Sequence, residues 1–210
     1  MAETAGAALE ADNLHLWRGA RHVLRGLSFR AVAAEALHLR GPNGCGKTSL
    51  LRTLAGFLWP EEGRLSWCGR AISADRDGFN AALAYLGHDN ALKADLTARE
   101  NITFATRLRH ATSAADLSAT LERLGVAAEA DLPVRVLSAG QRRRVAMARI
   151  VLARASLWLL DEPFTNLDTA GIRDLSQIVA AHVAAGGIAI LTAHADISLP
   201  GVPLRPLELA

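Results

Sequence analysis

The sequence predicts an α/β fold in which a mostly parallel sheet presents a phosphate-binding loop at one edge. A glycine-rich segment from Gly41 to Thr48 follows a short apolar strand pattern and precedes a helical one, which is the setting of a phosphate loop. A second apolar run, at 157–160, ends in Asp161 and Glu162, as a buried parallel strand does at the functional edge of its sheet. The chain between these segments is mostly helical, which predicts helices packed beside the sheet.

The other elements follow in order from hydrophobic period and from turn residues. Strands are expected near 13–17, 22–30, 35–40, 64–68, 82–87, 157–161 and 187–193. Helices are expected near 48–56, 97–109, 114–124, 138–153 and 168–185. The first four strands should supply an antiparallel part and the first core strand. Three prolines after residue 199 predict an irregular tail with at most a short edge strand.

The segment from Gly41 to Thr48 fits the eight-position phosphate-loop pattern without a gap. Its glycines let backbone N–H groups turn inward, and the following helix N-terminus adds partial positive charge where phosphate oxygens would lie. Lys47 can neutralise the outer phosphates, and the Thr48 hydroxyl is placed to ligate Mg²⁺. The predicted nucleotide-binding residues here are Gly41, Pro42, Asn43, Gly44, Cys45, Gly46, Lys47, Thr48 and Ser49.

The two acids after the 157–160 strand have separate expected roles. Asp161 is expected to join the Mg²⁺ shell, and Glu162 to orient or deprotonate the water that attacks the terminal phosphate. The alternative is an ordinary helix start whose acids stabilise the helix dipole. Pro163, Asp168 and a signature segment upstream argue against that alternative.

The signature segment is Leu137-Ser138-Ala139-Gly140-Gln141. With the phosphate loop, the acidic strand, Thr165-Asn166-Leu167-Asp168 and His194, it resembles the ATP-binding subunits of ABC transporters over nearly all 210 residues. The resemblance implies an ABC-type P-loop nucleotide-binding domain with a RecA-like core, an antiparallel β subdomain and a small helical subdomain. The core would take about 1–88 and 155–210, and the helical subdomain about 89–154.

The same resemblance implies a nucleotide site shared between two copies of the chain. Ser138, Gly140, Gln141 and Asp168 are expected to bind nucleotide, the signature residues acting on ATP held by the other chain of a head-to-tail homodimer. His194 stands in the place of the switch histidine and is expected to contact the terminal phosphate while holding Glu162 and water in line. Ala139 replaces the commoner glycine of the signature, which still allows close backbone approach.

A narrower resemblance lies in the segment 85–101, which begins Tyr85-Leu86-Gly87-His88, together with the segments 138–146 and 161–165. It is similar to the haem exporter ATP-binding subunits of bacterial cytochrome c maturation systems, in which a histidine occupies the place of the usual Q-loop glutamine. His88 is then a residue that couples nucleotide to the helical subdomain. An imidazole offers one donor or one acceptor, not an amide's pair. A surface histidine at a strand end is the alternative.

The narrower resemblance implies an ATPase that works for c-type cytochrome biogenesis, by haem export or by haem release from a haem chaperone. Its cofactors would be ATP and Mg²⁺, and its partners an integral membrane permease and a second copy of itself. The chain would sit at the cytoplasmic face of the bacterial inner membrane and reach the membrane only through its partner. Another ABC transporter subunit or a soluble ABC assembly ATPase is the alternative.

The adenine contact is open between two neighbouring residues. Many family members stack the base on an aromatic side chain here, and either the indole of Trp17 or the guanidinium of Arg18 could serve. Trp17 is equally suited to packing on the sheet.

Composition excludes several classes of function. The formal charge of +2 is too small to predict nucleic-acid binding. No run of about 18 apolar residues is present, and the N-terminus lacks the pattern of a signal peptide. Only about fifty residues separate His88 from Leu137, too few for the coiled coils of DNA-repair ATPases. The arginines at 142–144 are interpreted as a solvated helix face.

Overall fold

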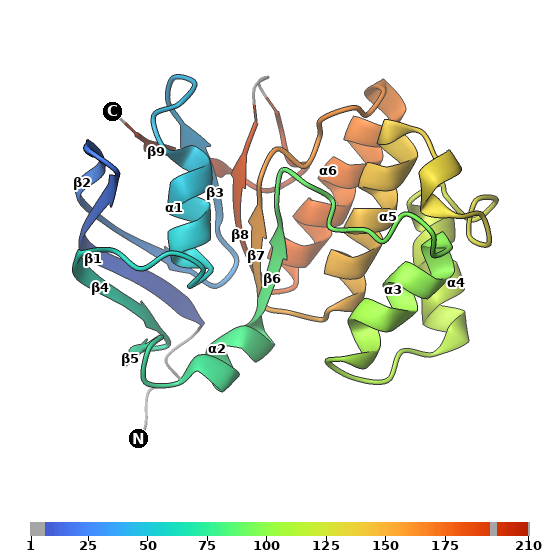
Figure 1. Cartoon of the computed structure of the whole chain (residues 1–210), viewed down its shortest axis with the longest axis horizontal. Coiled ribbons are helices and arrows are strands. Elements are labelled where there is room, and N and C mark those ends of the chain that lie inside the picture. The colour runs from blue at the N-terminus through green and yellow to red at the C-terminus, as the bar shows by residue number, and fades with distance from the viewer. Residues whose placement is uncertain (1–6, 194–196, 210) are drawn as a thin grey trace.

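The computed structural model describes residues 7–193 and 197–209, which form two sheets and a set of helices (Figure 1). An antiparallel sheet has the order β2-β1-β4-β5, and a wholly parallel sheet has the order β6-β7-β8-β3-β9. The strands are β1 Ala8–Arg18, β2 Arg21–Val32, β3 Ala36–Arg40, β4 Glu62–Trp67, β5 Arg70–Ala71, β6 Leu83–Leu86, β7 Leu157–Leu160, β8 Ile188–Thr192 and β9 Leu204–Glu208. The helices are α1 Lys47–Leu54, α2 Arg76–Ala82, α3 Ala98–Arg107, α4 Ala114–Arg123, α5 Ala139–Leu152 and α6 Thr169–Ala184, with a 3₁₀ turn at Val134–Val136.

The parallel sheet separates two hydrophobic cores because successive side chains of a strand point to opposite faces. In β7, Leu157 and Leu159 face the core shared with α1 and the antiparallel sheet, whereas Trp158 and Leu160 face the helices. β8 repeats this alternation. Both faces are therefore covered, which explains why these strands read as continuous apolar runs.

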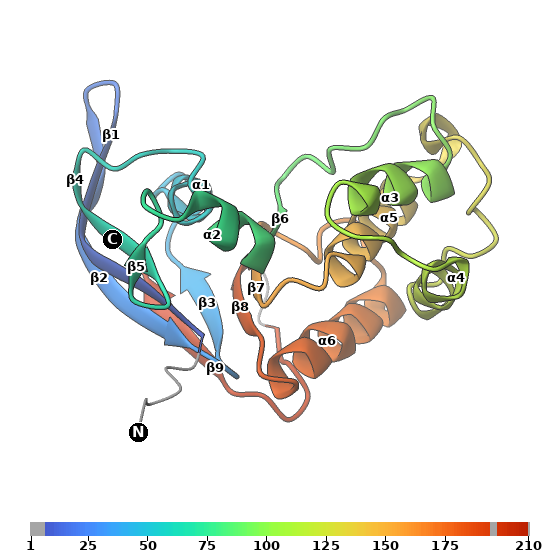
Figure 2. The ribbon, with the colours of Figure 1, turned by 90° about the horizontal axis from the view of Figure 1, so that it is seen from below.

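Helix α1 lies between the two sheets, and α6 covers the opposite face of the parallel sheet (Figures 1 and 2). Leu50, Leu51 and Leu54 of α1 are fully buried, and burying one leucine contributes about 1.5–3 kcal/mol. This packing holds the N-terminus of α1 at a defined place beside the sheet edge.

Helices α3, α4 and α5 group on the side away from the antiparallel sheet (Figure 2). Thr97 and Ser138 begin α3 and α5 with reciprocal capping boxes, which satisfy backbone donors at each helix start. The grouping supports our proposed helical subdomain at about 89–154. Among the described residues, no helix has the length and apolarity needed to cross a bilayer.

Two differences from the sequence-based expectations have local causes. β1 begins at Ala8 rather than near residue 13; register shifts around Asn13, whose φ is +49°, interrupt the alternation that would have marked its first half. Helix α2 is absent from the expected elements; its N-cap is Asp75, whose carboxylate accepts a hydrogen bond from the N–H of Gly78. The short edge strand allowed by the sequence in the tail is present as β9, which pairs with β3 although it contains Pro206.

Candidate functional site

The predicted phosphate loop and the predicted acids lie at the same edge of the parallel sheet. Leu86, Leu160 and Leu191 are neighbours across β6, β7 and β8, and Thr192 pairs with Leu39 near the end of β3. Every residue that follows these strands therefore emerges at their common carboxyl edge, where α/β proteins bind ligands. Asp161 is tied into this row, because its N–H donates to the carbonyl of Leu86 at 2.7 Å.

The phosphate loop has the backbone that its glycines allow. Gly44 has φ +78° and Gly46 has φ +115°, in the region that favours glycine. A Cβ on Gly46 would collide with the side chain of Val23. The Lys47 ammonium donates to the carbonyls of Gly41 at 2.7 Å and Pro42 at 3.1 Å. The loop thus curves around its own lysine at the N-terminus of α1.

Thr192 connects the two acids from the neighbouring strand. Its hydroxyl accepts a hydrogen bond from the N–H of Glu162 at 2.7 Å and donates to Asp161 Oδ1 at 3.0 Å. Asp161 is 2 % exposed, and its Oδ2 is buried without a hydrogen-bond partner among the described residues. A buried carboxylate oxygen of this kind suits a cation.

Glu162 adopts a left-handed backbone conformation, with φ +51°. For a residue other than glycine this conformation costs about 1–2 kcal/mol, and it turns the chain sharply away from β7. The Thr165 hydroxyl lies 3.4 Å from Glu162 Oε2. Such strain is found where surrounding contacts impose it, commonly at functional sites.

Arg143 was missed as a site residue, and the interpretation of 142–144 as a solvated helix face is wrong. Arg143 is 3 % exposed, and Arg142 donates to the carbonyl of Leu137. A signal was available in the sequence, because Arg143 lies four residues before Met147 and seven before Ile150. That spacing places it on the apolar face of α5.

The signature residues lie at the N-terminus of α5. The Ser138 hydroxyl accepts from the N–H of Gln141 at 3.1 Å, and the Gln141 side chain accepts from the N–H of Ser138 at 2.8 Å and donates to Glu129 at 2.9 Å. A Cβ on Gly140 would come within 2.6 Å of the carbonyl oxygen of Asn166. Glycine is required here because the two segments approach so closely.

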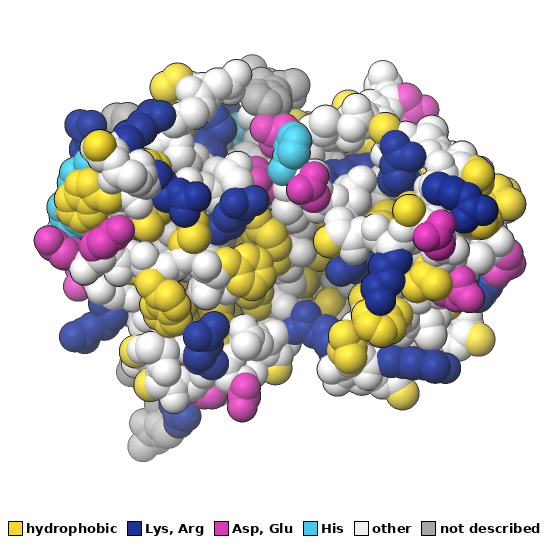
Figure 3. Space-filling view, viewed as in Figure 1, with side chains coloured by type: hydrophobic (Ala, Val, Ile, Leu, Met, Phe, Trp, Pro, Cys, Tyr) yellow, Lys and Arg dark blue, Asp and Glu magenta, His cyan; other side chains and the backbone are white. Residues whose placement is uncertain are grey.

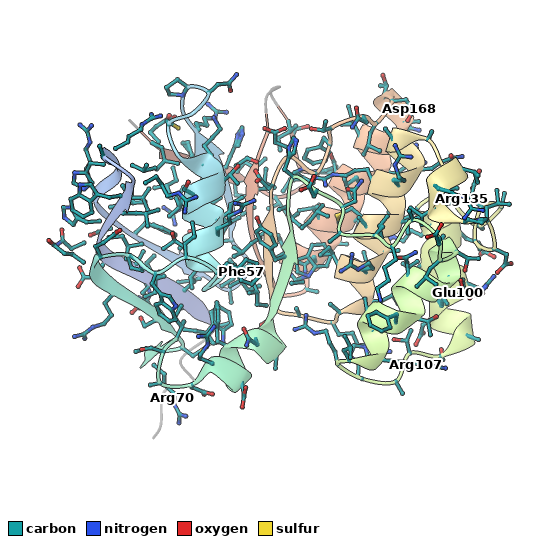
Figure 4. All side chains as sticks on the ribbon, in the orientation of Figure 1. Phe57, Arg70, Glu100, Arg107, Arg135 and Asp168 are labelled. Carbon is teal, nitrogen blue, oxygen red and sulfur yellow. The ribbon has the colours of Figure 1, made fainter. Side chains whose placement is uncertain are left out.

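Asp168 is the N-cap of α6 and lies at the upper end of that helix in Figure 4. It accepts from the N–H of Gly171 and from Arg144, both at 2.9 Å. The hydrogen bond from Gly171 is the main cause that lowers the pKa of Asp168, and the charge of Arg144 adds to it. A cavity of about 560 Å³ joins this residue to the signature; its lining is Gly125, Ser138, Ala139, Gly140, Gln141, Arg144, Asn166, Leu167 and Asp168.

The two predicted halves of the nucleotide site are therefore built separately within one chain. No residue of the loop from Gly41 to Thr48 lines the signature cavity. Gln141 and Asp168 are engaged in contacts of their own chain through Ser138, Glu129 and Arg144. His194 lies outside the described residues.

His88 is exposed two residues after the end of β6. It lines a cavity of about 390 Å³ together with Phe57, Tyr85 and Arg149. This cavity adjoins a second one of about 750 Å³ beside α3, with which it shares Ala91 and Arg149. Hydrophobic side chains gather in the hollow between the two halves of the molecule in Figure 3.

The hairpin between β1 and β2 carries both candidates for the adenine contact. Trp17 stacks on His22 with ring centroids 3.8 Å apart and an angle of 6° between the planes. His15 extends the stack, and its Nδ1 lies 3.1 Å from Nε2 of His22. One face of Trp17 is thus covered, whereas Arg18 beside it is exposed. Both side chains stay candidates for the base.

Comparison with known proteins identifies the family. A family model described as ABC transporter matches residues 24–165. The protein named "Cytochrome c biogenesis ATP-binding export protein CcmA" from Dechloromonas aromatica (strain RCB) is 46% identical over 202 residues, which cover 96% of this chain and 99% of that protein. The protein of the same name from Salmonella typhi is 46% identical over 201 residues, covering 96% of each.

Solved structures agree on the fold. A putative ABC transporter ATP-binding protein from Pyrococcus furiosus has a TM-score of 0.82 at 21% identity, with 96% of this chain and 97% of that chain covered. A bacterial Atm1-family ABC exporter with ATP bound has a TM-score of 0.81 at 29% identity; the match covers 90% of this chain and 35% of the exporter chain. The predicted α/β ABC-type nucleotide-binding fold is confirmed. The chain belongs to the ABC transporter family and, within it, to the cytochrome c biogenesis ATP-binding export proteins named CcmA.

Proposed function

We propose that this chain is the ATP-hydrolysing subunit of a membrane ABC complex in c-type cytochrome biogenesis. One observation carries the proposal: the register of β3, β6, β7 and β8 brings the phosphate loop and the Asp161–Glu162 pair to one edge of the sheet. The names of the relatives indicate the biological process, cytochrome c biogenesis, and the residues of the site indicate the reaction, ATP hydrolysis.

Hydrolysis uses groups from several segments of that edge. Lys47 and the N–H groups of the loop stabilise charge on the phosphates, since donors fixed before the reaction need no reorganisation during it. Glu162 orients the attacking water and takes its proton. His194 contacts the terminal phosphate. His88 links the nucleotide to the segment after β6.

The donor set at the sheet edge fits Mg²⁺. Asp161 and the Thr48 hydroxyl would hold the ion, because Mg²⁺ takes oxygen ligands and Asp161 Oδ2 is buried without a donor among the described residues. When bound, the ion neutralises negative charge on the nucleotide phosphates. Thr192 keeps the Asp161 carboxylate in place by its hydrogen bond to Oδ1.

The nucleotide lies between two copies of the chain. The cavity lined by Ser138, Gly140, Gln141 and Asp168 contains no residue of the phosphate loop in its lining, and the N-terminus of α5 carries partial positive charge suited to an anion. In a head-to-tail homodimer this cavity faces the phosphate loop of the other chain. ATP then closes the dimer, and hydrolysis releases it.

The adjoining cavities near His88 are the proposed seat of the membrane permease. Phe57 is 59 % exposed and Leu108 is 76 % exposed at their rims, and exposed apolar side chains grouped in a hollow mark interaction surfaces. Phe57 projects from the end of α1 beside β6 (Figure 4). In this proposal the chain is a peripheral protein that binds the permease at the cytoplasmic face of the inner membrane. Closure of the ATPase dimer changes the conformation of the permease, and this change drives haem export or haem release from a chaperone.

The first test is the association state of Glu162→Gln. Removing the carboxylate leaves ATP binding intact and blocks proton removal, so excess MgATP should convert the variant from monomer to a stable dimer in light scattering. Glu122→Gln, an exposed change on α4, is the matched control and should turn over ATP without trapping the dimer. A Glu162→Gln monomer in excess MgATP would refute the shared site.

The second test identifies the process. Tagged Glu162→Gln is purified from gently solubilised membranes in MgATP, copurifying proteins are identified by mass spectrometry, and haem absorbance is read alongside. Recovery of a polytopic membrane protein with haem-handling proteins supports the assignment to cytochrome c biogenesis. Recovery of another permease, or of a soluble complex, would discard the haem assignment and leave the ATPase mechanism standing.

A further inference from the structure

We propose that Arg143 is a positioning residue for ATP hydrolysis, which fixes the backbone of Glu162 and ties it to the segment that carries His88. The inference rests on the proposed ATPase function and deepens it. Arg143 lies on α5, the helix that begins at the signature, and its guanidinium contacts the segment that follows β7. Arg143 is buried. We assign the N-terminus of the same helix to the nucleotide that the other chain of the dimer holds.

The guanidinium of Arg143 donates hydrogen bonds to two segments, 161–163 and 87–90. Its acceptors are the carbonyls of Asp161, Glu162 (2.8 Å) and Pro163 (3.3 Å), the carbonyl of Gly87 (2.9 Å) and Oδ1 of Asn90 (2.9 Å). Every nitrogen of the fork is used. Five N–H groups in one rigid plane can hold acceptors from different segments at fixed separations, which no other side chain does.

Glu162 is held at both ends of its backbone. Its N–H donates to the Thr192 hydroxyl at 2.7 Å, and its carbonyl accepts from Arg143 at 2.8 Å. Between these two contacts the residue keeps φ +51°, a conformation that a glutamate adopts only when its surroundings impose it. Without Arg143 the peptide after Glu162 loses its donor, and the carboxylate no longer has one defined direction.

The positive charge of Arg143 also interacts with the carboxylates of Asp161 and Glu162. Burial lowers the pKa of the guanidinium, and the carboxylates of Asp161 and Glu162 act in the opposite direction. The group stays charged, since arginine does not lose its proton in proteins. A buried cation thus lies behind the two acids, where it balances their negative charge while its N–H groups hold the backbone.

The hydrogen bonds from Arg143 to Gly87 and Asn90 connect the two acids to the segment that carries His88. These residues flank His88, which is exposed and lines the cavity that we assign to the permease. A displacement of the segment 87–90 therefore reaches the Glu162 backbone through one rigid group. Arg143 connects that segment to the backbone of Glu162 through hydrogen bonds of a single side chain.

Arg149 provides a matched control on the same helix. It donates to the carbonyls of Asn90 at 3.0 Å and Ala91 at 2.8 Å, and burial lowers its pKa as well. It binds the same segment as Arg143, but its hydrogen bonds go to Asn90 and Ala91 rather than to Asp161, Glu162 or Pro163. Comparing the two arginines separates anchoring of the segment from positioning of Glu162.

The experiment measures ATPase kcat and KM, equilibrium ATP affinity and Tm for the full chain in its membrane complex. Arg143→Lys keeps the charge without the fork, and Arg143→Gln removes both. Both should lower kcat by at least about tenfold while ATP affinity changes by less than about twofold, because only the step after binding depends on Glu162. Arg149 lines the cavity assigned to the permease, so kcat is compared in preparations that contain equal amounts of the membrane partner; there Arg149→Gln should lower kcat by less than about threefold at a similar loss of Tm.

Each result decides the proposal. Wild-type kcat in Arg143→Lys, a loss of ATP affinity as large as the loss of kcat, or an equal loss of kcat in Arg149→Gln would overturn it. If Arg143→Gln does not fold, Arg143→Lys supplies the same readouts. A wild-type complex without ATPase activity, or Glu162→Gln turning over at the wild-type rate, would refute the proposed function instead.

Discussion

Thr192 is the residue whose replacement tests the construction of the site most directly. It is 1 % exposed on β8, and its hydroxyl is the only atom of that side chain with polar character. The substitution Thr192→Val keeps the shape and removes the hydroxyl. The N–H of Glu162 then loses its acceptor at 2.7 Å, and Asp161 Oδ1 loses its donor at 3.0 Å.

The size of the effect follows from the two groups left behind. A buried N–H without a partner costs about 1–3 kcal/mol, and a hydrogen bond to a charged group is worth about 1.5–3 kcal/mol. Valine returns a few tenths of a kcal/mol through its better fit to a strand. The free energy of unfolding should fall by about 2–4 kcal/mol at neutral pH.

Thr53→Val is the matched control. Thr53 is fully buried in α1, and its hydroxyl donates to the carbonyl of Ser49 at 2.9 Å. That carbonyl lies four residues earlier, where the helix's own N–H also reaches it, so the substitution leaves no acceptor without a donor. It should cost less than about 1 kcal/mol.

The assay is urea unfolding of both variants without nucleotide, followed by intrinsic fluorescence, with the slope compared to wild type. A Thr192→Val protein within about 0.5 kcal/mol of Thr53→Val would refute the view that Thr192 holds the two acids. If that view is right, the variant also hydrolyses ATP more slowly, because the Glu162 backbone is released at one end.

Two further predictions concern the signature and pH. Gly140→Ala places a Cβ within 2.6 Å of the Asn166 carbonyl, so ATPase activity should fall by at least about tenfold with ATP affinity nearly unchanged; Ala139→Gly is the control, and equal activity of the two variants would contradict the assigned contact. Burial lowers the pKa of His182, which stacks on Trp158 at 3.9 Å. As the pH falls below about 6.5, this histidine becomes protonated in the unfolded chain before it does in the folded chain. The free energy of unfolding therefore decreases as the pH falls through this range, by at most about 1.4 kcal/mol per pH unit. His182→Phe keeps the stack and should lose less Tm than wild type between about pH 7.5 and 5.5; equal losses would contradict this origin.

The sequence determined the features that are carried by contiguous residues. The phosphate loop from Gly41 to Thr48 was predictable because its function depends on the backbone of eight consecutive residues and on the strand and helix that flank them. The 157–160 strand and its acids were predictable for the same reason. The capping boxes at Thr97 and Ser138 are local as well.

The limits of prediction also have local causes. The long strand β1 was shortened in our expectation because a bulge near Asn13 interrupts its alternation. Helix α2 is short, contains Gly78 and Asn80, and shows little apolar period. Neither segment supplies enough regular pattern for its boundaries to be read from the chain.

Only the tertiary structure decided how the acids are held. Thr192 is 31 residues from Asp161 in sequence, and Arg143 is 56 residues from Gly87; their contacts exist because parallel strands β6, β7 and β8 end in register and α5 packs across them. The spacing of Arg143 from Met147 and Ile150 could have placed it on the buried face of α5, but the acceptors that it meets there belong to distant segments that only the fold brings close. The catalytic groups can thus be identified from motifs of consecutive residues, whereas their positions depend on contacts between elements that only folding brings together.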